Sequence, residues 1–73
     1  MKLYSYYDYE EAYYNCDVYA CKEIGCYLLS QMKDERSRDL YNKLNIIKYV
    51  YGDKDPEVAK LLSDVKCWLM VNC

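Results

Sequence analysis

Gly52-Asp53-Lys54-Asp55-Pro56-Glu57 is the stretch of sequence that decides the fold. Asp55 is a favoured N-cap residue, Pro56 suits the first helical position and Glu57 suits the first turn, so three signals start a helix here. Gly52 is a natural end for the helix before it. The sequence therefore predicts a helix over 56–72, and its apolar stripe is expected to be core: Val58, Leu61, Leu62, Val65 and Leu69.

Two further helices are predicted upstream of this turn. The segment 36–51 contains neither Gly nor Pro, its apolar residues Leu40, Leu44 and Ile47 recur at helical spacing, and either Asp34 or Ser37 could cap it. The segment 9–32 is predicted as one long helix with two apolar stripes, so it should touch two neighbours. Polar residues such as Lys22 are left for water. One stripe is Tyr14, Val18, Cys21, Gly25, Leu28 and Met32, and the other is Tyr9, Tyr13, Ala20, Ile24 and Tyr27.

Short connections between the predicted helices favour antiparallel neighbours. The expected fold is all-α, a single domain over residues 1–73 that forms a three-helix up-down-up bundle. A chain of 73 residues buries only about 60% of the surface that its unfolded form exposes. Such a small core usually gains support from a disulfide, a metal, regular helix packing or self-association.

The five cysteines are expected to be free thiols. Cys16, Cys21 and Cys26 recur every five residues, and on one helix successive members would point about 140° apart. The first ten residues contain no apolar signal segment, which favours a reducing, cytoplasmic location. Structural zinc prefers paired cysteines or Cys with His, and the chain has no His and no C-x-x-C pair. No cofactor is expected, and a cysteine-based metal or redox protein is the alternative function.

The charge pattern and residue types argue against several other functions. Ten basic and twelve acidic side chains give a net charge of −2, without the basic stripe that nucleic acid would require. No apolar run approaches the roughly 18 residues needed to span a membrane. There is no nucleophile beside a base and no carboxylate pair on an apolar face, so the protein is not expected to be an enzyme.

Part of the sequence resembles tetratricopeptide repeats of the kinesin light chain type. The similar residues are Ile24-Gly25-Cys26-Tyr27-Leu28, then Leu40-Tyr41, then GDKDPEVAKLL over 52–62, and the resemblance covers about residues 20–66. It implies a helical hairpin in which a small residue packs on a second helix and a Gly-to-Pro turn opens the next repeat. Met32-Lys33-Asp34 and Ser37 depart from the family pattern. Repeat helices bury their faces against neighbouring repeats, so something is expected to cover the end of this short array.

Two regions are candidate binding surfaces for a protein partner. The N-terminal region interleaves tyrosines with acids, which is typical either of a docking face, of a helix start whose tyrosines cover the core, or of a kinase target. The end of the last helix is apolar all round, which marks an interface unless the N-terminus folds back over it. The candidate residues are Tyr4, Tyr6, Tyr7, Tyr9, Tyr13, Tyr27, Cys67, Trp68, Met70 and Val71.

These observations together favour a non-enzymatic protein–protein interaction module. It would act as an adaptor or small inhibitor by binding another protein, and self-association into a homodimer or larger oligomer is expected. The chain is rich in tyrosine, with eleven Tyr, one Trp and no Phe, and such rings with a polar end suit half-buried surfaces.

Overall fold

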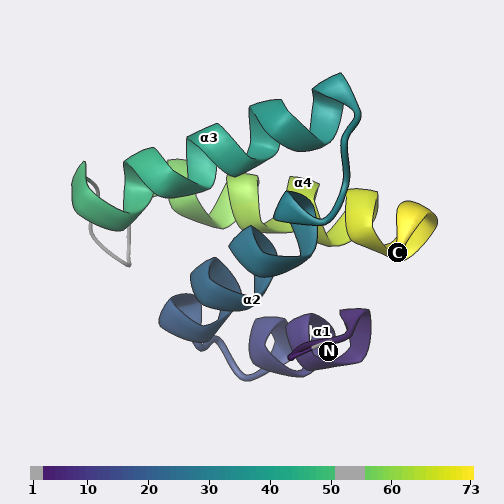
Figure 1. Ribbon diagram of the computed structural model, residues 1–73. Coiled ribbons are helices and arrows are strands. Elements are labelled where there is room, and N and C mark those ends of the chain that lie inside the picture. The colour runs from purple at the N-terminus through teal and green to yellow at the C-terminus, as the bar shows by residue number, and fades with distance from the viewer. Residues whose placement is uncertain (1–2, 51–55) are drawn as a thin grey trace.

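The computed structural model of the protein describes residues 3–50 and 56–73, with residues 48–50 described by their backbone alone. Within these ranges the chain forms four helices and no strand: α1 Tyr6–Tyr14, α2 Val18–Ser30, α3 Glu35–Val50 and α4 Pro56–Asn72 (Figure 1). The all-α class is confirmed, and α4 begins at Pro56 as predicted. The predicted Gly52 stop and Asp55 cap lie outside the described residues. None of the helices in the described ranges has the length and apolar character needed to cross a membrane.

The prediction of one helix over 9–32, and hence of three helices in all, is wrong because the chain turns between α1 and α2. Cys16 lies in the left-handed region with φ 57°. The Cys16 N–H donates to the Tyr13 carbonyl at 3.2 Å and the Asp17 N–H to the Ala12 carbonyl at 2.9 Å, a Schellman ending. The Asp17 carboxylate then accepts the Ala20 N–H at 3.1 Å and caps α2. The helix end at Cys16 and the helix start at Asp17 thus divide a segment whose apolar pattern is continuous.

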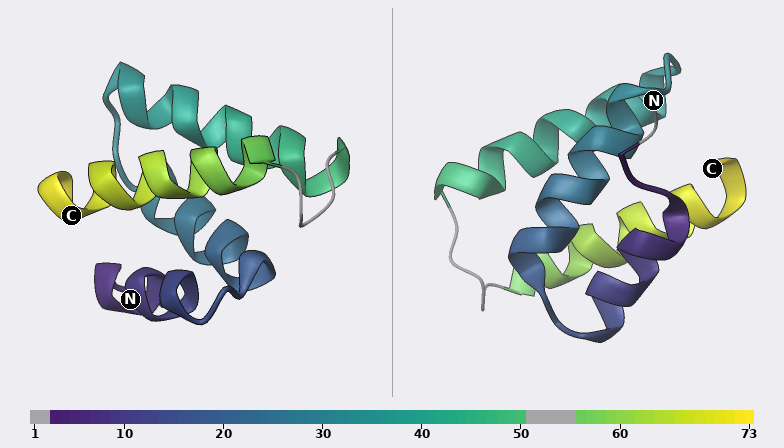
Figure 2. Two further views of the ribbon diagram at one scale, coloured as in Figure 1. Left: turned by 180° about the vertical axis from the view of Figure 1, so that it is seen from behind. Right: turned by 60° about the horizontal axis from the view of Figure 1, so that its bottom comes forward.

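The four helices are arranged with α1 and α3 on opposite sides of α2 and α4. In Figure 1 and in the left view of Figure 2, α3 and α4 lie side by side and run in opposite directions, while α2 leads from the end of α1 to the start of α3. Helices α2 and α4 each pack against the other three, whereas the described backbones of α1 and α3 lie apart and the two helices meet only through side chains beside α2. The core therefore lies along the crossing of α2 and α4.

Gly25 of α2 lies at the centre of this crossing. A Cβ atom at Gly25 would be 3.0 Å from Leu44 Cδ1 of α3, 3.2 Å from Tyr9 Cε2 of α1 and 3.6 Å from Val65 Cγ1 of α4. Tyr9 is fully buried, and its hydroxyl donates to the Leu62 carbonyl of α4 at 2.7 Å. The glycine thus lets side chains from all three other helices converge on α2.

The core confirms most of the predicted stripes. All five stripe residues of α4 are buried, as are Leu40, Leu44 and Ile47 of α3. Two expectations for the first segment are wrong. Tyr14 is 67% exposed and Lys22 is 5% exposed, because the turn at Cys16 changes the direction in which the flanking side chains point. Ala12 and Leu29 are buried members of the core that the single-helix pattern missed.

The structure also decides which residue caps α3. The Asp34 carboxylate accepts the Ser37 N–H at 2.9 Å and the Ser37 hydroxyl at 2.7 Å, so Asp34 is the cap. These hydrogen bonds from Ser37 hold the pKa of Asp34 below its ordinary value. Ser37 itself is buried and accepts the indole N–H of Trp68 at 2.7 Å, which ties α3 to α4.

Candidate protein-binding surface

The structure divides the predicted binding residues among three hollows, the core and, for Met70, the open surface of α4. Tyr9 has no exposed surface, so the expectation that it contacts a partner is wrong in this conformation, and it acts instead as a core residue. Tyr7, Met70 and Val71 are strongly exposed, at 76%, 55% and 78%. Cys67 is also exposed and Tyr4 is 37% exposed, whereas the remaining candidates are half-buried: Tyr6, Tyr13, Tyr27 and Trp68.

We call the first groove the tyrosine groove. It is a hollow of about 370 Å³ where the start of α1 meets the ends of α2 and α4, and its lining includes Tyr4, Tyr6, Tyr7, Tyr27, Met32 and Cys73. Four of the predicted binding residues therefore come together. Met32 and Cys73 were not predicted, because only the tertiary fold brings the end of α4 beside the N-terminal tyrosines.

The tyrosines of this groove are held in place by contacts with one another and with α2. The rings of Tyr4 and Tyr27 form an edge-to-face pair with centroids 5.7 Å apart, and the Leu3 N–H donates to the Tyr27 hydroxyl at 3.1 Å. The rings of Tyr6 and Tyr7 form a second edge-to-face pair at 5.9 Å. The segment before α1 is thus tied to the far end of α2, and the groove is formed before any partner arrives.

Tyr13 belongs to a separate apolar hollow at the other end of α1. This hollow of about 380 Å³ lies between the α1–α2 turn and the start of α4, and its lining includes Tyr13, Tyr14, Cys16, Val18, Val58 and Leu62. The ammonium group of Lys66 lies over the rings of Tyr13 and Tyr14, at 5.6 and 5.3 Å from their centroids. Hydrogen bonding to Tyr14 is the main cause that raises the pKa of Lys66, so this cation stays charged beside the rings.

The end of α4 supplies the last group of predicted residues. Cys67, Trp68 and Val71 line a hollow of about 340 Å³ together with Arg36 of α3. This hollow and the tyrosine groove share Asn72 in their linings, so the two surfaces adjoin at the end of α4. The N-terminal tyrosines approach this end of the helix, yet Met70 and Val71 remain exposed.

No family model, curated protein or solved structure matches this chain. The interpretation of the surface therefore rests on the chemistry of its own side chains.

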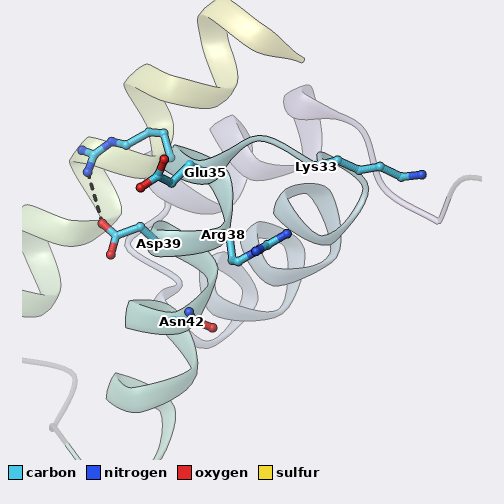
Figure 3. Close-up of a pocket in the computed structure, with 6 residues that line it drawn as sticks. Lys33, Glu35, Arg38, Asp39 and Asn42 are labelled. Atoms are coloured by element: carbon cyan, nitrogen blue, oxygen red, sulfur yellow. Dashed lines mark hydrogen bonds and ion pairs between the residues drawn. The ribbon is translucent and has the colours of Figure 1, made fainter.

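A further hollow, along the start of α3, lacks the features of a specific site. It measures about 820 Å³, and its lining is polar or charged: Lys33, Glu35, Arg36, Arg38, Asp39 and Asn42. Figure 3 shows Lys33 and Arg38 pointing away from Glu35 and Asp39 rather than toward a common point. Asp39 pairs with Arg36 at 3.4 Å and with Lys43 at 3.1 Å, and all three side chains are about half exposed. Such exposed pairs are solvated, and convergent groups are what a ligand site requires.

Two titratable groups of the interior, the Cys21 thiol and the Tyr9 hydroxyl, keep their protons at neutral pH. Burial raises the pKa of the Cys21 thiol to about 11, and burial likewise raises the pKa of the Tyr9 hydroxyl. A thiol with a raised pKa is a poor nucleophile at neutral pH, because the thiolate is the reactive form. All five cysteines are free, and Cys16, Cys67 and Cys73 are exposed. The described residues place no three Cys, Asp or Glu side chains close enough together to hold a metal ion.

Proposed function

We propose that this protein is a non-catalytic protein–protein interaction module, an adaptor or small inhibitor that acts by occupying a surface of another protein. The observation that carries the proposal is the tyrosine groove, an apolar hollow flanked by the exposed rings of Tyr4 and Tyr7 and continuous with the exposed end of α4. Contiguous exposed apolar surface on a small protein marks an interaction site.

The residue types of the groove support this proposal. Tyrosine offers a large apolar face with a polar end, and it is among the residues that contribute most binding free energy at interfaces. Because Tyr4 already contacts Tyr27 and Tyr6 already contacts Tyr7, less side-chain entropy would be lost when a partner binds. A preformed aromatic surface of this kind favours binding over chemistry.

Three finer expectations belong to the same proposal. Tetratricopeptide-like packing, now limited to the hairpin of α2 and α3 with α4 after it, is supported by the close approach of Gly25 of α2 to Leu44 of α3, since a small residue is expected at such a hairpin contact. Self-association is supported by the exposure of Met70 and Val71, which a second copy would cover. A reducing, cytoplasmic location is supported by the five free cysteines.

The proposal can be tested by capturing partners from the cells that make the protein. The test variant carries Tyr4→Ser and Tyr7→Ser, and the control variant carries Tyr19→Ser and Ile46→Ser, which removes exposed side chains away from the groove. We expect wild type and control to enrich the same protein, or to form the same oligomer by light scattering, and the test variant to lose it. Equal behaviour of both variants, each folded by circular dichroism, would contradict the proposal.

A further inference from the structure

The tyrosine groove lies where two helices end. Gln31 and Met32 follow the last turn of α2, Asn72 and Cys73 close α4, and all four residues line the groove. Neither helix has a basic residue in its last turn. The carboxyl end of a helix carries the equivalent of about half a negative charge. The negative ends of two helix dipoles therefore lie beside the same apolar hollow, although several last-turn carbonyls already accept hydrogen bonds, among them those of Leu28, Leu29 and Leu69.

Two acidic side chains beside the groove add to this negative potential, while one cation, Lys66, interacts with the Tyr6 hydroxyl at its edge. The Glu10 carboxylate accepts the Tyr6 hydroxyl at 3.1 Å, and the Asp8 carboxylate accepts the Ser5 N–H at 2.7 Å, beside two residues of the lining. Among the described lining residues themselves none is basic. Lys33 follows α2 but lines the hollow along α3, where it points outward (Figure 3).

The groove also presents the kind of surface on which cations bind well. An ammonium or guanidinium group is attracted to the face of a tyrosine ring within about 6 Å of its centroid. Tyrosine rings of α1 already attract a cation at the other end of this helix. The Lys66 ammonium lies 5.6 and 5.3 Å from the ring centroids of Tyr13 and Tyr14. Tyr7 is 76% exposed and Tyr4 is 37% exposed, so parts of both rings remain accessible to a cation from outside.

We propose that the tyrosine groove binds a cationic side chain, Arg or Lys, presented by an otherwise apolar segment of a protein partner. This inference rests on the proposed function and names the chemistry of its partner. The rings supply the apolar and cation–π contacts, and the negative ends of the two helix dipoles supply an attractive potential. A hollow of about 370 Å³ is at the small end of ligand pockets, which suits one long side chain with its neighbours.

The experiment uses the isotopically labelled full chain and three matched peptides as probes. Each peptide has the same Leu- and Ala-based sequence of 12 residues, about three helical turns, with the variable positions filled by Arg, by Gln or by Glu. Amide and ring resonances are followed by NMR during titration. We expect the Arg peptide to bind, to shift residues at Tyr4, Tyr7, Tyr27 and Cys73, and to weaken as salt is added. The Gln peptide should bind at least several-fold more weakly, and the Glu peptide more weakly still.

Two variants with similarly exposed tyrosines distinguish two causes of Arg-peptide binding. One cause is contact with a ring of the groove, and the other is general attraction of the peptide to an acidic protein. Tyr7→Leu keeps an apolar side chain but removes a ring of the groove, and Tyr19→Leu does the same at a residue that is 70% exposed outside it. A cation–π contact at an exposed site corresponds to a two- to fivefold change in affinity, roughly. We expect that loss for Tyr7→Leu and none for Tyr19→Leu.

Two results would overturn the inference. Equal affinity for the Arg and Gln peptides would show that the groove does not select a cation, and equal loss in both tyrosine variants would show that no ring of the groove is involved. Neither result bears on the capture experiment, in which the Tyr4 and Tyr7 variant can still lose its partner. Failure of the capture experiment instead would remove the proposed function itself.

Discussion

Among the residues that the structure describes, Cys16 is the one residue with a side chain whose φ is positive. Its φ of 57° lies in the left-handed region, which costs a residue with a side chain about 1 kcal/mol and costs glycine almost nothing. Because Cys16 is exposed, removing its side chain gives up little packing. Cys16→Gly should therefore raise the free energy of unfolding by about 0.5–1 kcal/mol, measured by urea denaturation in reducing buffer. Cys16→Ala is the control, since it removes the thiol but keeps a Cβ, and an equal gain from both variants would contradict this explanation.

Gly25 presents the opposite case, a glycine required by close packing. Alanine would improve the helix propensity of α2 by about 1 kcal/mol. Its Cβ, however, would lie 3.0 Å from Leu44 Cδ1 and 3.2 Å from Tyr9 Cε2, and neither side chain has exposed surface into which it can move. Overpacking of this kind costs roughly 1–3 kcal/mol. We expect Gly25→Ala to lower the free energy of unfolding by about 1 kcal/mol net.

The measurement for Gly25 is again urea denaturation, followed by the fluorescence of the single tryptophan. Gly25→Val should be more destabilising than Gly25→Ala, because a larger side chain meets the same three helices. Alanine at Ser30, an exposed position at the end of α2, is the control for helix propensity. An increase in stability from Gly25→Ala would mean that Leu44 and Tyr9 can shift.

At the scale of the helices, the separation of α1 from α2 depends on Asp17. Its carboxylate accepts the Ala20 N–H at 3.1 Å and thereby caps the start of α2. This N-cap makes α2 a separate helix, so the predicted long helix is divided in two. Asp17→Ala should cost about 1 kcal/mol of stability, whereas Asp17→Asn should cost little because Asn caps equally well. Thermal unfolding of the two variants tests this. Equal losses would indicate that charge rather than capping holds the turn.

The helices also show how far the sequence can predict local structure. The start of α4 was predictable because Pro56 and Glu57 give signals that no neighbouring pattern contradicts. The turn at Asn15, Cys16 and Asp17 was missed because apolar residues continue at helical spacing on both sides of it. Asp17 could have predicted this turn, because Asp is a favoured N-cap residue. In the structure its carboxylate accepts the N–H of Ala20, three residues later.

At the scale of the whole molecule, the binding surface depends on contacts that sequence spacing cannot supply. The helical pattern grouped Tyr9 with the other N-terminal tyrosines, but α1 packs against α2 and α4, so Tyr9 is buried while Tyr7 is exposed. Cys73 joins the tyrosine groove only because α4 ends beside the start of α1. The tyrosine-rich character of the surface was thus predictable from composition. Which residues line the groove could be learned only from the tertiary arrangement.

The buried groups of this arrangement also make the stability of the whole molecule depend on alkaline pH. The folded state raises the pKa of Cys21 from 9.0 to about 11, and burial raises the pKa of Tyr9 above its ordinary 10.0. Above pH 9 the unfolded chain therefore loses protons that the folded chain keeps. Stability is fully present below pH 9 and falls as pH rises, by up to about 1.4 kcal/mol per pH unit for each group.

Urea denaturation in reducing buffer at pH 7.5, 9, 10 and 10.5 would measure this dependence. Between pH 9 and 10 the decline should come from Cys21, so Cys21→Ala should flatten it even though the variant starts from a lower stability. Above pH 10 Tyr9 should add to the slope, and Tyr9→Phe should remove that part. Cys73→Ala removes an exposed thiol and should leave the slope unchanged. Parallel declines in wild type and Cys21→Ala between pH 9 and 10 would show that the buried thiol does not link folding to pH.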